Sequence, residues 1–212
     1  MLIAIDGPAG AGKSTVARAV ADALGFTYLD SGAMYRCVAL AALSRGIALD
    51  DAAALGGITR ELVIDPRPGR VMLDGENVTA AIRAPEVGDA ASRISVHPQV
   101  RAAMLDRQRA LIATGRYVAE GRDIGTVVAP AAELKVFLTA SDDERVRRRA
   151  EQTGEPADSV RESLRDRDRR DSEREHAPLH AADDAVELDT TGLDAEQVTA
   201  RVVELARERG LA

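Results

Sequence analysis

The stretch that decides the fold is Gly7-Pro8-Ala9-Gly10-Ala11-Gly12-Lys13-Ser14, which has the form G-x-x-x-x-G-K-S. It follows the short apolar run 2–6, which is rich in strand formers. It precedes residues 15–24, whose apolar positions recur at helical spacing. Strand, glycine-rich loop and helix in this order are the context that a phosphate-binding loop (P-loop) requires.

The residue types of this loop indicate what it binds. Its glycines allow successive backbone N–H groups to point inward at a phosphate, with the positive end of the following helix behind them. The Lys13 ammonium can reach the outer phosphates, and the Ser14 hydroxyl can face a magnesium ion. The sequence therefore predicts a protein that binds a nucleoside triphosphate together with a magnesium ion.

Composition narrows the class of protein. A length of 212 residues with 45% hydrophobic residues predicts one domain with a small appendage. The net charge of −7 argues against a surface that coats nucleic acid, so no nucleic-acid partner is expected. The single cysteine, Cys37, excludes an intramolecular disulfide and is expected to pack as a small apolar residue. His97, His176 and His180 are expected at the surface, because no cysteine or carboxylate cluster of matching spacing accompanies them.

Targeting and membrane signals are not evident in the sequence. The N-terminal apolar run is too short for a signal peptide and leads straight into the glycine-rich loop. The longest apolar run after it, residues 37–43, is far too short to span a membrane. We therefore expect a cytoplasmic protein without a membrane partner. Because no long apolar surface stripe is evident, we also expect a monomer.

Strands and helices alternate through much of the chain. Strands are expected at 2–6, 26–29, 116–120, 133–138 and 185–188, and helices at 15–24, 33–45, 51–61, 142–152, 156–175 and 194–209. Residues from about 86 to 113 are expected to be mostly helical, with Pro98 in the first turn of a helix. This alternation predicts an α/β fold, a P-loop three-layer α/β/α domain with a parallel five-stranded central sheet.

The alternation of strands and helices is interrupted between residues 58 and 85. Short β-prone runs at 62–65, 70–74 and 76–79 are separated by the turn signals Pro66-Arg67-Pro68-Gly69 and Asp74-Gly75. Strands joined by turns without helices form an antiparallel meander. We expect a small antiparallel β insertion at 58–85 on a core of residues 1–57, 86–141 and 177–212, with a short helical lid at 142–176.

A P-loop does not identify the acceptor, and three polar stretches are the first candidates. In 29–36 a strand end runs into a helix, and Ser31 is there either a helix N-cap or a substrate contact. Residues 89–92, with Arg101 shortly after, could equally be a solvated helix face. Residues 120–126 follow a buried strand, where ligands gather in open α/β sheets, although a surface salt bridge between Arg122 and Asp123 is the alternative.

The fourth stretch, residues 165–174, alternates arginine and aspartate, which is typical of an exposed helix. Arg167, Asp171 and Arg174 nevertheless lie at i, i+4 and i+7, so they share one face. Three further arginines share a face in the same way ahead of Gly154, namely Arg145, Arg148 and Arg149. This pattern predicts an arginine-bearing lid that closes over a triphosphate.

Taken together, these stretches resemble the bacterial cytidylate kinase family of nucleoside monophosphate kinases over essentially the whole chain. The resemblance rests on GPAGAGKST at 7–15, LDSGAMYR at 29–36, EVGDAAS…HPQVR at 86–101, EGRDIGTVV at 120–128, and RDRRDSER at 167–174 followed by Ala177-Pro178-Leu179. It implies the reaction MgATP + (d)CMP → ADP + (d)CDP. It also implies that the insertion at 58–85 belongs to the acceptor-binding part.

The resemblance implies a role for each matching residue. ATP would be bound by Gly7, Pro8, Ala9, Gly10, Ala11, Gly12, Lys13, Ser14, Thr15 and the lid residue Arg148. The cytosine would be held by Ser92, Arg101 and Asp123. The acceptor phosphate would be held by Arg36, Arg122 and Arg174, which with Lys13 form the catalytic set. Ser31, Arg167 and Asp171 would lie at the sugar and its neighbourhood.

Two positions depart from the family's pattern. Ala129 stands where an aromatic residue is frequent, and it adjoins the site without putting a contact in doubt. Ser14 stands where some members have glycine. Direct Mg²⁺ ligation by Ser14 is therefore expected from the P-loop rule and not from the family as a whole.

The chemistry of cytosine suits these residue types. Its exocyclic amine can donate to Asp123 and Ser92, and its ring nitrogen and carbonyl can accept from Arg101. Uracil inverts two of these groups, which predicts a preference for CMP of roughly three orders of magnitude. The alternatives are a kinase for another small acceptor, such as UMP or a sugar-like alcohol, and a non-catalytic nucleotide switch. A guanine-reading switch is disfavoured because the one asparagine, Asn77, is not in an Asn-Lys-x-Asp segment.

Overall fold

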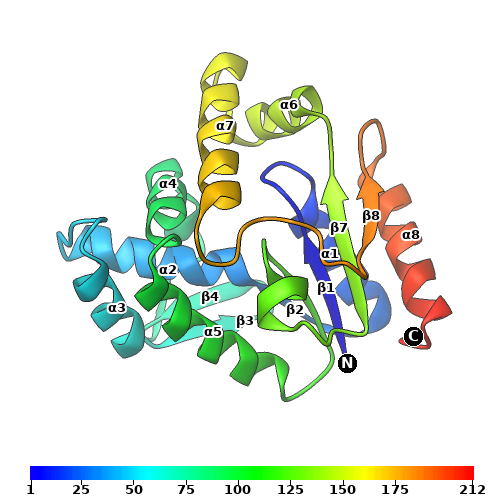
Figure 1. Cartoon of the computed structure of the whole chain (residues 1–212), viewed down its shortest axis with the longest axis horizontal. Coiled ribbons are helices and arrows are strands. Elements are labelled where there is room, and N and C mark those ends of the chain that lie inside the picture. The colour runs from blue at the N-terminus through cyan, green and yellow to red at the C-terminus, as the bar shows by residue number, and fades with distance from the viewer. The chain divides into compact units, whose positions relative to one another are not determined.

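The computed structural model describes all 212 residues of the chain, which forms two compact units (Figure 1). The first unit consists of residues 1–29, 115–173 and 177–212. The second consists of residues 30–114 and 174–176.

A five-stranded sheet forms the centre of the first unit. Its strands are β1 (Leu2–Asp6), β2 (Thr27–Asp30), β6 (Tyr117–Glu120), β7 (Leu134–Thr139) and β8 (Val186–Asp189), in the order β2-β6-β1-β7-β8. The strands run parallel, as in the pairings of β1 with β6 and β7 and of β7 with β8. The predicted parallel five-stranded sheet is thus confirmed, and β1, buried along its whole length, lies in the middle.

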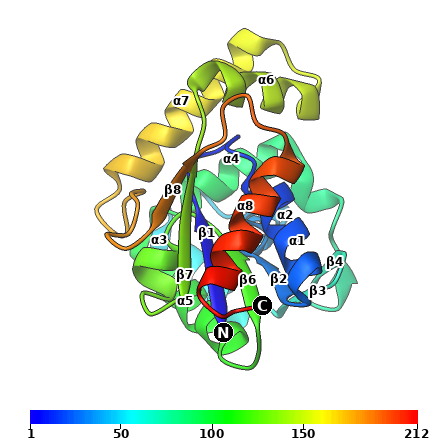
Figure 2. The same cartoon turned by 90° about the vertical axis from the view of Figure 1, so that its right-hand side faces the viewer.

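The two faces of β1 meet different elements. Ile3 and Ile5 belong to a buried cluster that includes side chains of α1 (Lys13–Leu24) and α8 (Ala195–Glu208), and these two helices pack together on that face (Figure 2). Because side chains alternate along a strand, Ala4 and Asp6 point to the opposite face. There the short π-helical turn η2 (Ile124–Val128) contacts β1.

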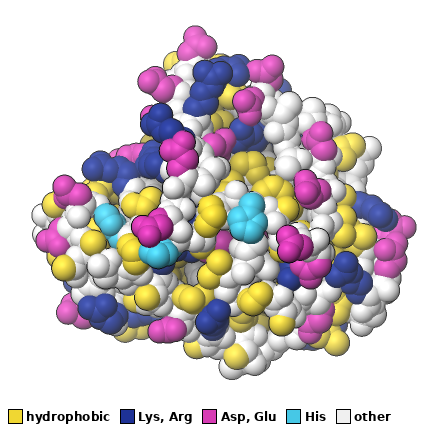
Figure 3. Space-filling model, in the orientation of Figure 1, with side chains coloured by type: hydrophobic (Ala, Val, Ile, Leu, Met, Phe, Trp, Pro, Cys, Tyr) yellow, Lys and Arg dark blue, Asp and Glu magenta, His cyan; other side chains and the backbone are white.

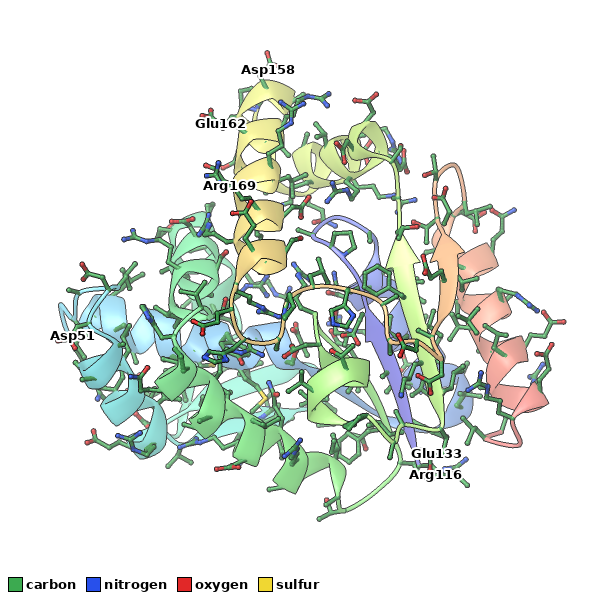
Figure 4. The ribbon with its side chains drawn as sticks, viewed as in Figure 1. Asp51, Arg116, Glu133, Asp158, Glu162 and Arg169 are labelled. Atoms are coloured by element: carbon green, nitrogen blue, oxygen red, sulfur yellow. The ribbon has the colours of Figure 1, made fainter.

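The charged helices α6 (Asp142–Thr153) and α7 (Ala157–Glu173) pack against each other. Their apolar residues form a small cluster with Ala9 of the P-loop. Figure 4 shows Asp158, Glu162 and Arg169 along the outer side of α7. Acidic and basic side chains are interspersed over both helices on the face drawn in Figure 3. The expected exposed face of α7 is therefore present, and its other face is packed.

The second unit carries α2 (Ser31–Ser44), α3 (Ala52–Glu61), β3 (Ile64–Arg67), β4 (Arg70–Leu73), β5 (Glu76–Asn77), η1 (Ala81–Arg83), α4 (Pro85–Ile94) and α5 (Pro98–Ile112). Strands β3, β4 and β5 form an antiparallel sheet, which confirms the predicted meander. Gly69 and Gly75 adopt positive φ in its two turns. Helix α2 packs on α4 and α3 on α5. Residues 58–85 lie within this unit.

The cysteine and the three histidines differ in their exposure to solvent. Cys37 is fully buried on α2, as predicted, and burial raises the pKa of its thiol to about 12. His176 and His180 are exposed, whereas His97 is half-buried with its Nε2 2.8 Å from the Leu49 carbonyl oxygen. The prediction of a surface position was therefore wrong for His97. None of the helices combines the length and hydropathy needed to cross a bilayer.

Candidate active site

The P-loop connects β1 to α1 through backbone that only glycine adopts easily. Gly7 has φ +145°, and a Cβ there would stand 2.1 Å from the Leu138 carbonyl oxygen of the neighbouring strand. Gly12 has φ +89° and precedes α1 without any side chain capping the helix. The first-turn N–H groups of α1 therefore face outward at the positive end of the helix, where an anionic group is favoured.

Lys13 is the first residue of α1, and its ammonium donates to the Pro8 carbonyl oxygen at 2.7 Å. The pKa of Lys13 is held well below 10.5, chiefly because the residue is buried, and then because Arg122 and Arg167 lie close by. The carboxylates of Glu120 and Asp171 oppose this effect. Lys13 thus lies in a buried cluster of two guanidinium groups and two carboxylates, and a phosphate bound there would favour its charged form.

Arg122 links three segments of the first unit. Its Nε donates to Asp171 Oδ2 of α7 at 2.8 Å, and its Nη1 donates to the Gly7 carbonyl oxygen at 3.1 Å. The two side chains of the ion pair are only 16% and 5% exposed. The alternative of a surface salt bridge at Arg122 and Asp123 is therefore wrong for Arg122, whose partner is a buried carboxylate of another segment. Asp123 itself is buried and immediately precedes η2.

The predicted face of α7 brings two of its three residues to the P-loop. Arg167 and Asp171 both act electrostatically on Lys13, with opposite effects on its pKa. Arg174 follows the last residue of α7 and belongs to the second unit, where it is buried. The shared-face prediction thus holds for Arg167 and Asp171 within the first unit.

The lid arginines differ from one another. Arg145 is buried, and its guanidinium donates to Asp142, to Asp168 and to the Ala9 carbonyl oxygen. These bonds hold it within the protein, and the closing of the lid arginines over a triphosphate stays a prediction. Its bonds connect α6, α7 and the P-loop, since Asp142 lies on α6 and Asp168 on α7.

Arg148, on the same helix, remains beside the P-loop. Its Nη2 donates to the Thr190 carbonyl oxygen at 2.7 Å and its Nη1 to the Thr190 hydroxyl at 2.9 Å. A Cβ on Gly12 would stand 3.5 Å from Arg148 Nη1. The guanidinium is thus anchored next to the start of α1, and its assignment to ATP stays a prediction.

The second unit carries the remaining predicted residues. Asp30, not Ser31, caps α2, because its side chain accepts from the Ala33 N–H at 2.8 Å. The alternative that Ser31 is the N-cap was therefore wrong, and Ser31 is a buried first-turn residue. Arg36 is half-buried one turn further along α2. Arg101 of α5 is buried and donates to the Ser95 carbonyl oxygen at 3.4 Å.

Ser92 has an unusual environment on α4. It is 3% exposed, and its Oγ has no hydrogen-bond partner within the chain. A buried hydroxyl without a partner is unfavourable by roughly 1–3 kcal/mol. Such a group is readily explained by a ligand that supplies the missing partner.

Asp6 is a functional candidate that sequence reasoning missed. It is the last residue of β1, and its two carboxylate oxygens accept from the N–H groups of Ile124 and Gly125. Burial raises its pKa to about 6, although these two hydrogen bonds act in the opposite direction. The sequence feature that could have indicated it is a single carboxylate at the end of an otherwise apolar strand.

Glu120, at the end of β6, lies in the predicted stretch 120–126 but was given no role there. Its buried carboxylate accepts a hydrogen bond from the Tyr28 hydroxyl and raises the pKa of Lys13. The π-helical turn η2 was not expected either. The turn is too short for a helical repeat of hydrophobic residues to be recognised in the sequence.

The chain is similar in sequence to known proteins. The family model described as "Cytidylate kinase" matches residues 3–208. The cytidylate kinase of Geobacillus thermodenitrificans is 50% identical over 98% of this chain and 96% of its own length. That of Saccharophagus degradans is 48% identical over 100% of this chain and 99% of its own length.

Solved structures show the same fold at low sequence identity. A sugar kinase from Janibacter sp. has a TM-score of 0.51 and 18% identity, covering 100% of this chain and 97% of that chain. A shikimate kinase from Acinetobacter baumannii has a TM-score of 0.50 and 18% identity, covering 100% of this chain and 95% of that chain. At this identity the likeness concerns the fold alone.

Proposed function

The chain belongs to the cytidylate kinase family, and we propose that it transfers the terminal phosphoryl group of ATP to CMP or dCMP, giving ADP and CDP or dCDP. The observation that carries this proposal is the P-loop lysine, Lys13, which is buried at the start of α1 and lies close to the guanidinium groups of Arg122 and Arg167. It is supported by curated relatives of the same name that match the chain over nearly its full length.

The donor side follows from the P-loop. Its backbone N–H groups and the start of α1 bind the phosphates of ATP, Thr15 continues that first turn, and Arg148 contributes from α6. Ser14 is exposed at the start of α1 and fits a Mg²⁺ site, because Mg²⁺ takes few protein ligands when nucleotide phosphates and water supply the rest. When bound, the ion neutralises charge on the phosphates.

Phosphoryl transfer needs positioning and positive charge but no covalent intermediate. Lys13, Arg36, Arg122 and Arg174 stabilise the charge of the transferred group. Arg122 is held in advance by Asp171 and by the Gly7 carbonyl oxygen, so its guanidinium does not have to reorganise during the reaction. The α6–α7 pair acts as a lid that excludes water, and residues 142–176 make up this part.

Acceptor recognition is assigned to the residues that match the family's motifs. Ser92, Arg101 and Asp123 bind the cytosine, and the unpartnered Ser92 hydroxyl supports its share of this role. Arg36, Arg122 and Arg174 bind the acceptor phosphate. Ser31, Arg167 and Asp171 bind the sugar and its surroundings. The small sheet of residues 58–85 supports the acceptor, and the protein works as a cytoplasmic monomer.

An assay of ADP release across acceptors tests this function. CMP and dCMP should stimulate ATP consumption strongly, and UMP should have a kcat/KM roughly three orders of magnitude lower. Equal kcat/KM for CMP and UMP would contradict the assigned base recognition. ATP consumption that is not increased by CMP would instead favour a nucleotide switch, and activity with a sugar-like alcohol would favour another small-molecule kinase.

A further inference from the structure

Asp6 is a buried acidic residue at the end of the central strand, with no role in the transfer described above. It is 5% exposed and closes a strand whose other residues are apolar. Desolvating a carboxylate is unfavourable, so a carboxylate kept in this position needs partners. The partners it has are two consecutive backbone N–H groups of η2, from Ile124 at 2.9 Å and from Gly125 at 2.7 Å.

These two hydrogen bonds take the place of an N-cap that the residue before η2 would otherwise provide with its own side chain. Asp123 immediately precedes η2, where an aspartate usually caps with its own side chain. Here the Asp123 side chain makes no capping hydrogen bond, and its backbone has φ −151° and ψ 26°. Asp6 of β1 already accepts the N–H groups of Ile124 and Gly125. The Asp123 carboxylate therefore does not have to fold back to cap η2.

The contact between Asp6 and the turn is close. A Cβ on Gly125 would stand 3.4 Å from Asp6 Oδ2 and 3.2 Å from the Lys135 side chain of β7. The next residue after Asp6, Gly7, accepts the hydrogen bond of Arg122 Nη1 through its carbonyl oxygen. Three hydrogen bonds therefore connect the start of the P-loop to residues 122–125.

We propose that Asp6 is a positioning residue for acceptor selection: by accepting the N–H groups of Ile124 and Gly125, it orients the backbone that carries Arg122 and Asp123. The inference rests on the proposed function, in which Asp123 reads the cytosine. It makes the selectivity for the base depend on a residue of the donor-binding strand. Asp6 itself touches no substrate in this scheme.

Asp6→Asn tests the proposal with little change in side-chain volume. The amide oxygen can accept one of the two N–H groups, whereas the amide nitrogen faces the other donor. We expect the ratio of kcat/KM for CMP to that for UMP to fall about tenfold or more, because an amide cannot accept both N–H groups and the backbone of Arg122 and Asp123 is held less firmly. The KM for ATP should change less than about threefold.

Asp51→Asn is the matched control. Asp51 caps α3 by accepting the Ala54 N–H at 2.9 Å, and it lies at the exposed start of that helix (Figure 4). The control removes a capping carboxylate without touching η2, so its CMP-to-UMP ratio should equal that of the wild type. A folded Asp6→Asn protein that also keeps the wild-type ratio would overturn the proposal.

If Asp6→Asn does not fold, the proposal is tested by hydrogen exchange and proton chemical shifts of backbone amides in the wild-type protein. The amides of Ile124 and Gly125 should exchange slowly with solvent, and their proton shifts should follow one titration that reports Asp6. The titratable groups that face Asp6 are Lys13 and Asp123, so their own shifts are followed in parallel. Rapid exchange at both amides would overturn the proposal.

Asp123→Ala in the same assay separates this inference from the proposed function. If Asp123→Ala leaves the CMP-to-UMP ratio unchanged, the assignment of base recognition to Asp123 fails. If Asp123→Ala lowers the ratio and Asp6→Asn does not, only the positioning role of Asp6 fails. A fall in the ratio with both variants supports the two together.

Discussion

Arg122 and Asp171 form a buried ion pair in which Arg122 Nε donates to Asp171 Oδ2 over 2.8 Å. The pair joins the segment after β6 to α7, across 49 residues of sequence. Arg122 also donates to the Gly7 carbonyl oxygen, so a single guanidinium connects the P-loop, the central sheet and α7. The planar, multi-donor shape of arginine makes this double connection possible, and lysine cannot reproduce it.

Replacement of Arg122 by lysine should therefore reduce turnover although the charge is kept. We expect Arg122→Lys to lower kcat by about a hundredfold or more, because the positive charge is no longer held in place. The free energy of unfolding should fall by roughly 1–3 kcal/mol, because the buried Asp171 carboxylate loses the hydrogen bond from Arg122 Nε. Steady-state kinetics and urea unfolding measure the two effects.

Arg147→Lys is the control for this change. Arg147 is an exposed arginine that pairs with Glu144 and Glu151, and exposed pairs contribute little. Its replacement should alter neither kcat nor the free energy of unfolding appreciably. Near-normal kcat in Arg122→Lys would place Arg122 outside the catalytic set.

Ser92→Ala should separate function from stability. The Ser92 hydroxyl has no partner in the chain, so its removal should leave the free energy of unfolding unchanged or raise it by about 1 kcal/mol. The kcat/KM for CMP should nevertheless fall about tenfold, because the cytosine loses a contact. Chemical unfolding and the ADP-release assay provide the two readouts.

Ser95→Ala provides the opposite pattern. The Ser95 hydroxyl donates to the Ser92 carbonyl oxygen at 2.8 Å, so this variant loses an internal hydrogen bond. Its free energy of unfolding should fall by about 1 kcal/mol, with a smaller effect on kcat/KM for CMP than that of Ser92→Ala. A large loss of stability in Ser92→Ala would show that its hydroxyl has an internal role.

ATP affinity should depend on pH through Lys13. Burial and the nearby arginines hold the pKa of Lys13 well below 10.5, so the ammonium loses its proton at a lower pH than an ordinary lysine does. Because ATP binds to the charged form, the affinity should fall as pH rises through this lowered pKa. Binding should also be accompanied by proton uptake in that range, since the phosphates favour the charged form.

Calorimetry in buffers of different ionisation enthalpy measures both the affinity and the proton uptake. Lys13→Arg is the matched variant, because arginine keeps its charge at every pH used. Its ATP affinity should lack the alkaline fall, whatever its absolute value. An affinity of the wild-type protein that stays constant at alkaline pH would contradict the assigned role of Lys13.

Stability should respond to the titration of Asp6. Its pKa is raised from 3.8 to about 6 in the folded protein, so the folded state binds the proton more tightly than the unfolded state. The contribution of Asp6 to the free energy of unfolding should therefore decrease as pH rises from about 4 to about 6. A shift of about two pKa units corresponds to a change on the order of 3 kcal/mol.

The difference in unfolding free energy between the wild-type protein and Asp6→Asn isolates this effect from other carboxylates. That difference should change by roughly 3 kcal/mol in favour of the variant between about pH 4 and about pH 6. Urea unfolding at a series of pH values measures it. A difference that is independent of pH would mean that Asp6 does not titrate in this range.

The fold and the motif residues could be predicted because they depend on local pattern. The glycines of 7–12 and the flanking apolar runs specify a strand, a loop and a helix, and alternating elements specify a parallel sheet. The antiparallel meander was equally visible in its turn residues. The short turn η2 was not visible, because it leaves no periodic signal.

The sequence by itself thus determined the P-loop, the parallel sheet and the types of residue that bind phosphates, because backbone sterics and hydrophobic periodicity act over a few neighbouring residues. Only the tertiary structure decided which charges meet. In the folded chain Arg122 pairs with Asp171, and Arg145 donates hydrogen bonds to the Ala9 carbonyl oxygen and to Asp168. Asp6 accepts a hydrogen bond from the backbone of η2. Such pairings depend on distances between segments far apart in the chain, which local pattern does not encode.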